Sequence, residues 1–147
     1  MEQGKWNPDL MLMLLEPFAY LLMALAEKAS TNSDKKRFTY ILAGDGDLQE
    51  PIAIGASTLA GHWKLSNLIM FYDKNDIQIA GKTSRVDSTN YAKLFGAMDW
   101  HVQVIDGHDH QEIREALNNA QLNEKPSIII GQTTIAKMQK LSIVNTA

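Results

Sequence analysis

The sequence of 147 residues contains no cysteine, so neither a disulfide nor a thiolate metal site can form within it. It also lacks a basic run: 17 acidic and 14 basic residues give a formal net charge of −3. Because nucleic-acid-binding domains typically carry a basic patch or stripe, we expect no nucleic-acid partner. The composition, 45% hydrophobic and 21% charged, is that of a globular protein. This length predicts a single domain over residues 1–147, complete or incomplete.

A hydrophobic run long enough to cross a membrane is missing too. Residues 10–26 are strongly apolar, but Glu16 and Pro17 interrupt them, and the run is shorter than the roughly 20 residues that span a bilayer. Only Lys5 precedes the run and no clear cleavage site follows it, which disfavours a signal peptide. We therefore predict a buried or interfacial helix over Leu10–Ala29, no membrane association and a cytoplasmic location.

Predicted strands and helices alternate along the rest of the chain. Apolar runs without alternation predict buried strands over Phe38–Ala43, Asn67–Asp73, Trp100–Ile105 and Ser127–Gln132. Helices are expected over Asp47–Gly61, Asn90–Met98 and Asp109–Leu122, a short extended piece over Ile77–Ala80, and a polar loop over Gly81–Thr89. Such alternation indicates an α/β fold, a three-layer sandwich with a mostly parallel sheet. The order of the strands cannot be read from this pattern.

The ends of two predicted strands carry the most specific signal. Gly44-Asp45-Gly46 follows the first strand, and Asn75 follows the second, 30 positions after Asp45. If each strand end delivers one oxygen ligand to a common point, the pair suits a hard cation such as Mg²⁺ that carries a diphosphate. Gly-Asp-Gly is also a common turn. Its context favours a site, because the two glycines allow close backbone approach and a following helix turns free N–H groups toward a phosphate.

Four segments of the chain, GDGDLQE, LAGHWKLSNLIMFYDKNDIQIAG, WHVQVIDGHD and KPSIIIGQTTI, resemble transketolase. The resemblance covers roughly Tyr40–Ile135. It implies a thiamine-diphosphate-binding fold, with thiamine diphosphate and Mg²⁺ or Ca²⁺ as cofactors. It also implies transfer of a two-carbon ketol unit between sugar phosphates. This chain would be the part that binds the diphosphate of the cofactor.

The same resemblance implies roles for individual residues in holding the cation. Asp45 and Asn75 would be its side-chain ligands, and the backbone carbonyl of Ile77 would complete the protein's share of the coordination shell.

Further contacts to the cofactor are implied around the glycine turn and near the end of the last strand. Gly44, Gly46 and Asp47 would lie against the diphosphate, with backbone donors at Gly46 and, less firmly matched, Asp47. Ile135 would lie near the cofactor ring. Glu50 would lie at a dimer interface and help to connect two cofactors.

Several positions depart from the family pattern. Glycine is usual in the family at five positions, where this chain has Pro51, Asp76, Asp99, Ala136 and Met138. A second interface glutamate falls at Gly55. Asp47 adds a negative charge beside the expected diphosphate, where the family often has cysteine. A glycine-rich segment before Ala24 and a histidine segment after Ile135 are not recognisable.

The chain is too short to contain the family's pyrimidine-binding domain, which carries the glutamate that activates the cofactor. We therefore assign no catalytic residue to this chain and expect no ketol transfer from it alone. The expected partner is a second copy of the chain or a separate pyrimidine-binding subunit, with sugar phosphates as substrates of the complete enzyme.

Two other functions remain open at this point. One is a non-catalytic module, a truncated paralogue that dimerises or assists a full-length partner. The other is a Mg²⁺-dependent phosphohydrolase of the haloacid-dehalogenase type, because an apolar strand precedes Asp45-x-Asp47. That family requires Thr or Val where Leu48 stands, and it leaves Asn75 unexplained.

Other polar residues have simpler structural interpretations. Asp73 and Asp76 are expected to form turns, and Glu50 could be an exposed residue in the first turn of a helix. His108 and His110 flank Asp109, which is expected to cap a helix, so we interpret DGHD as a turn rather than a metal site.

Overall fold

The computed structural model describes residues 21, 23–26, 28, 37–78 and 81–135. Residues 21, 23–26 and 28 are helical, and the rest of the predicted first helix lies outside the described residues. The other elements are, in chain order, β1 (Thr39–Gly44), η1 (Asp47–Gln49), α2 (Pro51–His62), β2 (Leu68–Lys74), β3 (Ile77–Gln78), β4 (Gly81–Lys82), η2 (Thr83–Arg85), α3 (Tyr91–Ala97), β5 (His101–Asp106), α4 (His110–Leu122) and β6 (Ser127–Gln132).

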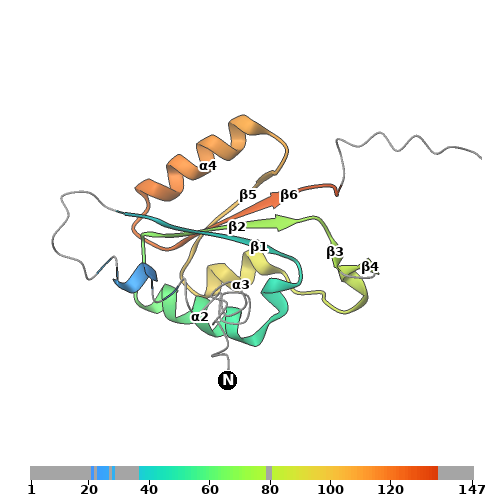
Figure 1. Ribbon diagram of the computed structural model, residues 1–147, viewed down its shortest axis with the longest axis horizontal. Helices are drawn as coiled ribbons and strands as arrows, with labels where there is room; N and C mark the ends of the chain where they lie inside the picture. The colour runs from blue at the N-terminus through green and yellow to red at the C-terminus, as the bar shows by residue number, and fades with distance from the viewer. Residues whose placement is uncertain (1–20, 22, 27, 29–36, 79–80, 136–147) are drawn as a thin grey trace, which may run out of the picture.

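Four strands form a parallel sheet in the order β1-β2-β6-β5. Helix α4 covers one face of the sheet, while α2 and α3 cover the other (Figure 1). The fold is therefore the predicted three-layer α/β sandwich. Because the strands are parallel, their carboxyl ends all lie at one edge, which is where ligands bind in open α/β sheets.

The two faces of the sheet are packed to different extents. The larger cluster of buried side chains lies between the sheet and α2 and α3, and it includes Leu21 and Ala24 of the first helix. The smaller cluster, on the α4 face, has four buried members, Ile69, Ala116, Ala120 and Ile129. On this second face, Tyr40 and Leu42 of β1 are 50% and 75% exposed. Among the described residues, no helix is long and apolar enough to cross a membrane.

The predicted helix that follows the Gly44-Asp45-Gly46 turn is interrupted near its start. A single helix was expected over Asp47–Gly61, but the short turn η1 is separated from α2 by Glu50, whose backbone is extended (φ −70°, ψ 126°). Pro51 then occupies the first position of α2. That is the place a proline tolerates in a helix, because its missing N–H would have no partner there.

The helix α2 runs one residue beyond Gly61, where the predicted helix ended, and the residue that terminates it with a left-handed backbone is Lys64 (φ 49°). The N–H of Leu65 bonds the carbonyl of Ala60 at 3.1 Å, and the N–H of Lys64 bonds that of Gly61 at 3.0 Å, which is the Schellman pattern. Gly61 is needed for a different reason: a Cβ there would lie 1.8 Å from the carbonyl oxygen of Met98.

The segment after β2 is more ordered than predicted. The expected extension at Ile77–Ala80 and the expected loop at Gly81–Thr89 contain a small antiparallel hairpin, β3 with β4, outside the main sheet. The short helical turn η2 follows. Residues 79 and 80 lie outside the described residues. The hairpin returns the chain to its start, since the N–H of Thr83 bonds the carbonyl of Asp76 at 2.9 Å.

Candidate functional site

The carboxylate of Asp45 lies at the end of β1, is only 3% exposed and accepts three hydrogen bonds. The hydroxyl of Tyr72 donates to Oδ1 at 2.8 Å. The backbone N–H groups of Asn75 and Asp76 donate to Oδ2, at 3.2 and 3.0 Å. The two strand ends therefore meet as the sequence predicted, and Asp45 lies directly beside Asn75.

The side chain of Asn75 makes hydrogen bonds to Ile77 and to a second aspartate, Asp73. Its Oδ1 accepts the N–H of Ile77 at 3.0 Å, and its Nδ2 donates to Oδ2 of Asp73 at 3.2 Å. The carboxylate of Asp45 and the amide of Asn75 thus lie at one loop, next to Ile77, whose carbonyl is the third oxygen that the family resemblance implies. Such a set suits Mg²⁺, which binds through oxygen ligands, uses one or two carboxylates and keeps several waters.

Two of the positions where the resemblance leads us to expect glycine have a left-handed backbone, Asp76 (φ 60°) and Asp99 (φ 64°). Glycine adopts this conformation without strain, and aspartate is among the few other residues that visit it. At each position a lysine pairs with the carboxylate, Lys74 with Asp76 and Lys125 with Asp99. The backbone shape expected from glycine is therefore kept in this chain although the glycine is not.

The turn between β1 and α2 is closed by Asp47. The N–H of Gly44 donates to Oδ2 of Asp47 at 2.7 Å, so this carboxylate faces back toward the strand. Gly46 is exposed, and a Cβ placed on it would meet nothing within 4 Å. The first N–H groups of a helical turn have no partner within the turn. The backbone of Gly46 and Asp47 is thus open to a ligand from one side.

Two buried tyrosines pack against each other near Asp45. Tyr72 is 1% exposed, and its ring meets that of Tyr91 edge-on with centroids 5.7 Å apart. The hydroxyl of Tyr91 donates to Asp87 at 2.7 Å. Burial, and then the hydrogen bond to the partner aspartate, raises the pKa of each tyrosine. Both hydroxyls therefore remain protonated donors at neutral pH.

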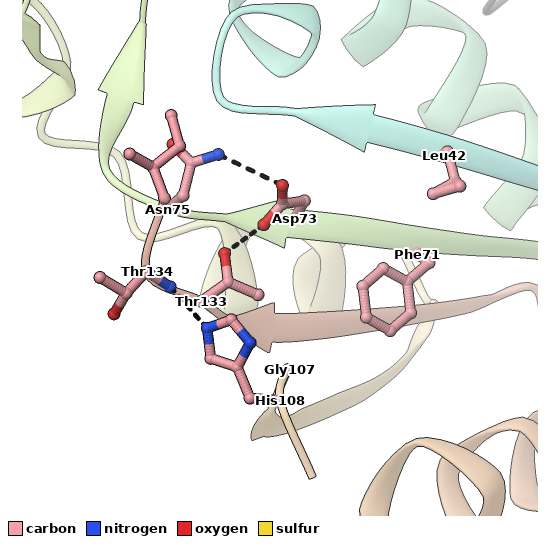
Figure 2. A pocket seen from close by; sticks show the side chains of 9 residues that line it. Leu42, Phe71, Asp73, Asn75, Gly107, His108, Thr133 and Thr134 are labelled. Atoms are coloured by element: carbon pink, nitrogen blue, oxygen red, sulfur yellow. Dashed lines mark hydrogen bonds between the residues drawn. The ribbon is translucent and has the colours of Figure 1, made fainter. Parts of the chain in front are cut away.

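A groove of about 400 Å³ opens at the same edge of the sheet, on the α4 side (Figure 2). It is lined by Leu42, Phe71, Asp73, Asn75, Gly107, His108, Thr133, Thr134 and Ile135. Two glycines let the strand ends approach closely there, since a Cβ on Gly131 would lie 2.6 Å from the ring of Phe71 and one on Gly107 would lie 2.4 Å from Thr133.

The polar side of this groove is held by hydrogen bonds that Figure 2 shows. The hydroxyl of Thr133 donates to Asp73, and the N–H of Thr134 donates to Nε2 of His108 at 2.8 Å. That second bond requires an unprotonated Nε2. The sequence pattern had indicated only turns at Asp73 and His108. The signal that could have identified them is their position, at the end of β2 and just after β5.

Three further predicted residues differ in how exposed they are. Ile135 is 59% exposed and lines the groove. Ile77 is 39% exposed. Glu50 is exposed at the start of α2, and its side chain makes no capping hydrogen bond there.

In the part of the chain that the structure describes, no group of three or more His, Asp or Glu side chains is placed to hold a metal. The mixed set of Asp45, Asn75 and Ile77 that the family resemblance implies is not a cluster of this kind.

Comparison with known proteins agrees with this geometry. Residues 19–143 match the transketolase, thiamine diphosphate binding domain. The chain is 45% identical over 100 residues to a transketolase of Sinorhizobium medicae, which covers 68% of this chain and 14% of that protein. It is 43% identical over 122 residues to the transketolase of Bacillus subtilis, with 77% and 18% covered.

The solved structures that resemble this fold are transketolases as well. That from Campylobacter jejuni superposes with a TM-score of 0.73 at 40% identity, covering 82% of this chain and 19% of that one. That from Leishmania mexicana gives 0.72 at 32% identity, covering 81% and 19%. The chain thus spans less than a fifth of the length of these relatives. The protein belongs to the transketolase family and corresponds to part of its thiamine-diphosphate-binding domain.

Proposed function

We propose that this chain holds the diphosphate of thiamine diphosphate, through Mg²⁺ or Ca²⁺, as part of a transketolase. The observation that carries the proposal is the meeting of Asp45 and Asn75. They come from the ends of two adjacent parallel strands, and the N–H of Asn75 bonds the carboxylate of Asp45. The family match supports the cofactor, and the oxygen ligands support a hard cation.

In this proposal, different residues bind the cation, the diphosphate and the apolar part of the cofactor. Asp45, Asn75 and the carbonyl of Ile77 hold the cation, and the open backbone at Gly46 and Asp47 donates to the diphosphate. The groove receives the apolar part of the cofactor, since its lining includes the apolar side chains of Leu42, Phe71 and Ile135. The polar side chains of Asp73 and Thr133 line it as well.

When bound, thiamine diphosphate supplies the carbanion and the electron sink for transfer of a two-carbon ketol unit between sugar phosphates. The residues of this chain bind and orient that group. The chain covers only 14% and 18% of the two relatives compared, which supports a need for further parts of the enzyme. We propose that the isolated chain does not turn over substrate.

The partner is a second copy of this chain or a separate pyrimidine-binding subunit. Three partly exposed apolar side chains support an interface on α2 and just beyond it. Ile52, Leu59 and Trp63 are 39%, 37% and 39% exposed, and their spacing places them along one side of the helix. Glu50 lies at the start of the same helix. This surface also favours the alternative of a dimerising, non-catalytic module.

The phosphohydrolase alternative is disfavoured by the match of residues 19–143 to the thiamine diphosphate binding domain of transketolase. The second aspartate of the motif, Asp47, bonds the N–H of Gly44.

Calorimetric titration of the full chain with thiamine diphosphate, with and without Mg²⁺, tests the proposal. We expect heat of binding that requires the cation, together with no turnover in a coupled ketol-transfer assay on chain freed of host enzyme. Addition of a pyrimidine-binding subunit should restore activity if the chain is one half of a split enzyme. A lack of binding in the presence of Mg²⁺ would contradict the proposal and leave the alternative in which the chain is a non-catalytic module that binds no cofactor.

A further inference from the structure

The orientation of the Asp45 carboxylate is set by groups that are not themselves candidate ligands. Each carboxylate oxygen has two lone pairs. Oδ2 of Asp45 accepts two N–H groups, from Asn75 and Asp76, so both of its lone pairs are used. From the part of the chain that the structure describes, Oδ1 accepts only the hydroxyl of Tyr72, which leaves one lone pair for a cation.

We infer that Tyr72 is a positioning residue for the cation site: its hydroxyl fixes the one carboxylate oxygen of Asp45 that remains able to bind a metal. This inference rests on the proposed function, because it assumes that Asp45 is a ligand. Hydrogen bonds from outer-shell groups hold metal-ligating side chains in place, and their loss typically costs 10–100-fold in metal affinity.

The packing around Tyr72 suits this task. The side chain is 1% exposed, reaches Asp45 from the neighbouring strand β2, and rests edge-on against Tyr91. A side chain confined in this way holds its hydroxyl in one place. Asp76, whose backbone is left-handed, also helps to hold the Asp45 carboxylate, because its N–H is one of the two donors to Oδ2.

Tyr91 provides a matched control for the experiment. It too is a buried tyrosine with one hydroxyl bonded to an aspartate, and it shares the ring contact with Tyr72, but its partner is Asp87. Tyr72→Phe and Tyr91→Phe each remove one buried oxygen, so each should lower the melting temperature. Only Tyr72→Phe should change the affinity for Mg²⁺.

The test is a calorimetric titration of Mg²⁺ into the full chain mixed with thiamine diphosphate. We expect the Kd for Mg²⁺ to rise about 10-fold or more in Tyr72→Phe, and to stay near the parent value in Tyr91→Phe. Equal affinities in the two variants, or tighter binding in Tyr72→Phe, would overturn the inference. Failure of the parent chain to bind Mg²⁺ would instead remove the proposed function on which the inference depends.

A second measurement on the parent chain covers the case in which Tyr72→Phe does not fold. With tyrosine labelled by ¹³C at Cζ, addition of Mg²⁺ and thiamine diphosphate should shift the Tyr72 resonance more than that of Tyr91. The four tyrosines can be assigned from Tyr20→Phe, Tyr40→Phe and Tyr91→Phe, with Tyr72 the one that remains. An unmoved Tyr72 resonance on a chain that binds the cation would contradict the positioning role.

Discussion

The two faces of the sheet differ in how much apolar surface they bury, and residues of the candidate site lie on both. Against α2 and α3 the strands pack into the larger cluster, which holds Asp45 from behind through Tyr72. Against α4 the cluster is small, Leu42 is 75% exposed, and a groove reaches the edge of the sheet. One face supplies rigidity and the other supplies access, so mutations on the two faces should have different consequences.

The largest difference should come from truncating one apolar side chain on each face. Phe95 is fully buried on the α3 side and packs edge-on against Trp100 with centroids 5.1 Å apart. Phe95→Ala should lower the free energy of unfolding by about 3–5 kcal/mol. Leu42→Ala, at an exposed site, should change it by no more than about 0.5 kcal/mol. Urea denaturation measures both, and equal losses would show that the α4 face is as well packed as the other.

A pair of glycines on α2 sharpens the same comparison within one helix. Gly61 faces the packed layer, whereas Gly55 is exposed and a Cβ added to it would meet nothing within 4 Å. Gly61→Ala should destabilise the fold by about 1–3 kcal/mol, because its methyl group would collide with the backbone of Met98. Gly55→Ala should stabilise it by about 0.5–1 kcal/mol, because glycine is a poor helix former. Thermal unfolding of the two variants should therefore move in opposite directions.

One substitution at the end of α2 should make the fold more stable. Lys64 holds the left-handed position of the Schellman motif, which usually belongs to glycine. Lys64→Gly should raise the free energy of unfolding by about 1 kcal/mol, because it removes the steric cost of a Cβ in this conformation. A lower melting temperature for Lys64→Gly would mean that the lysine side chain has a contribution that outweighs this cost.

The smallest effect should be a pH dependence from His101 at the start of β5. Burial, and then the nearby charge of Lys125, lowers the pKa of this imidazole in the folded protein. The unfolded chain then binds the proton more readily, so stability should be greatest above the unfolded pKa of about 6.5 and should decrease as the pH falls below it. Urea midpoints at several pH values between neutral and mildly acidic should show this slope in the parent and a flatter one in His101→Gln. Identical slopes would exclude His101 as the cause.

The strands and the central pair of the site could be predicted from sequence. Apolar runs indicate strands, and alternation with helices indicates a parallel sheet. The prediction that all four strands are buried holds for β2 and β6 but is wrong for β1 and β5, where Tyr40, Leu42 and Val104 are exposed. Parallel strands place their carboxyl ends together, and so the pattern of strands alone leads one to expect that Asp45 and Asn75 meet.

The groove could not be predicted, because it depends on the order of the strands. Strand β6 inserts between β2 and β5 and thereby places Thr133 beside Asp73 and Gly107 beside Gly131. The break at Glu50 could have been predicted, because the residue before a proline is disfavoured from the helical region and Pro51 follows. The left-handed Lys64 could not, because lysine does not signal a helix end.

Binding of thiamine diphosphate to two charge-matched variants tests the central claim most directly. Asp45→Asn and Asp87→Asn each remove one negative charge, and each leaves an oxygen able to accept the hydrogen bond of its tyrosine. Calorimetric titration in the presence of Mg²⁺ should show that thiamine diphosphate binds to the parent and to Asp87→Asn. Its binding to Asp45→Asn should be absent or greatly weakened. Cation-dependent binding that is unchanged in Asp45→Asn would contradict the account, because it would remove Asp45 from the metal shell.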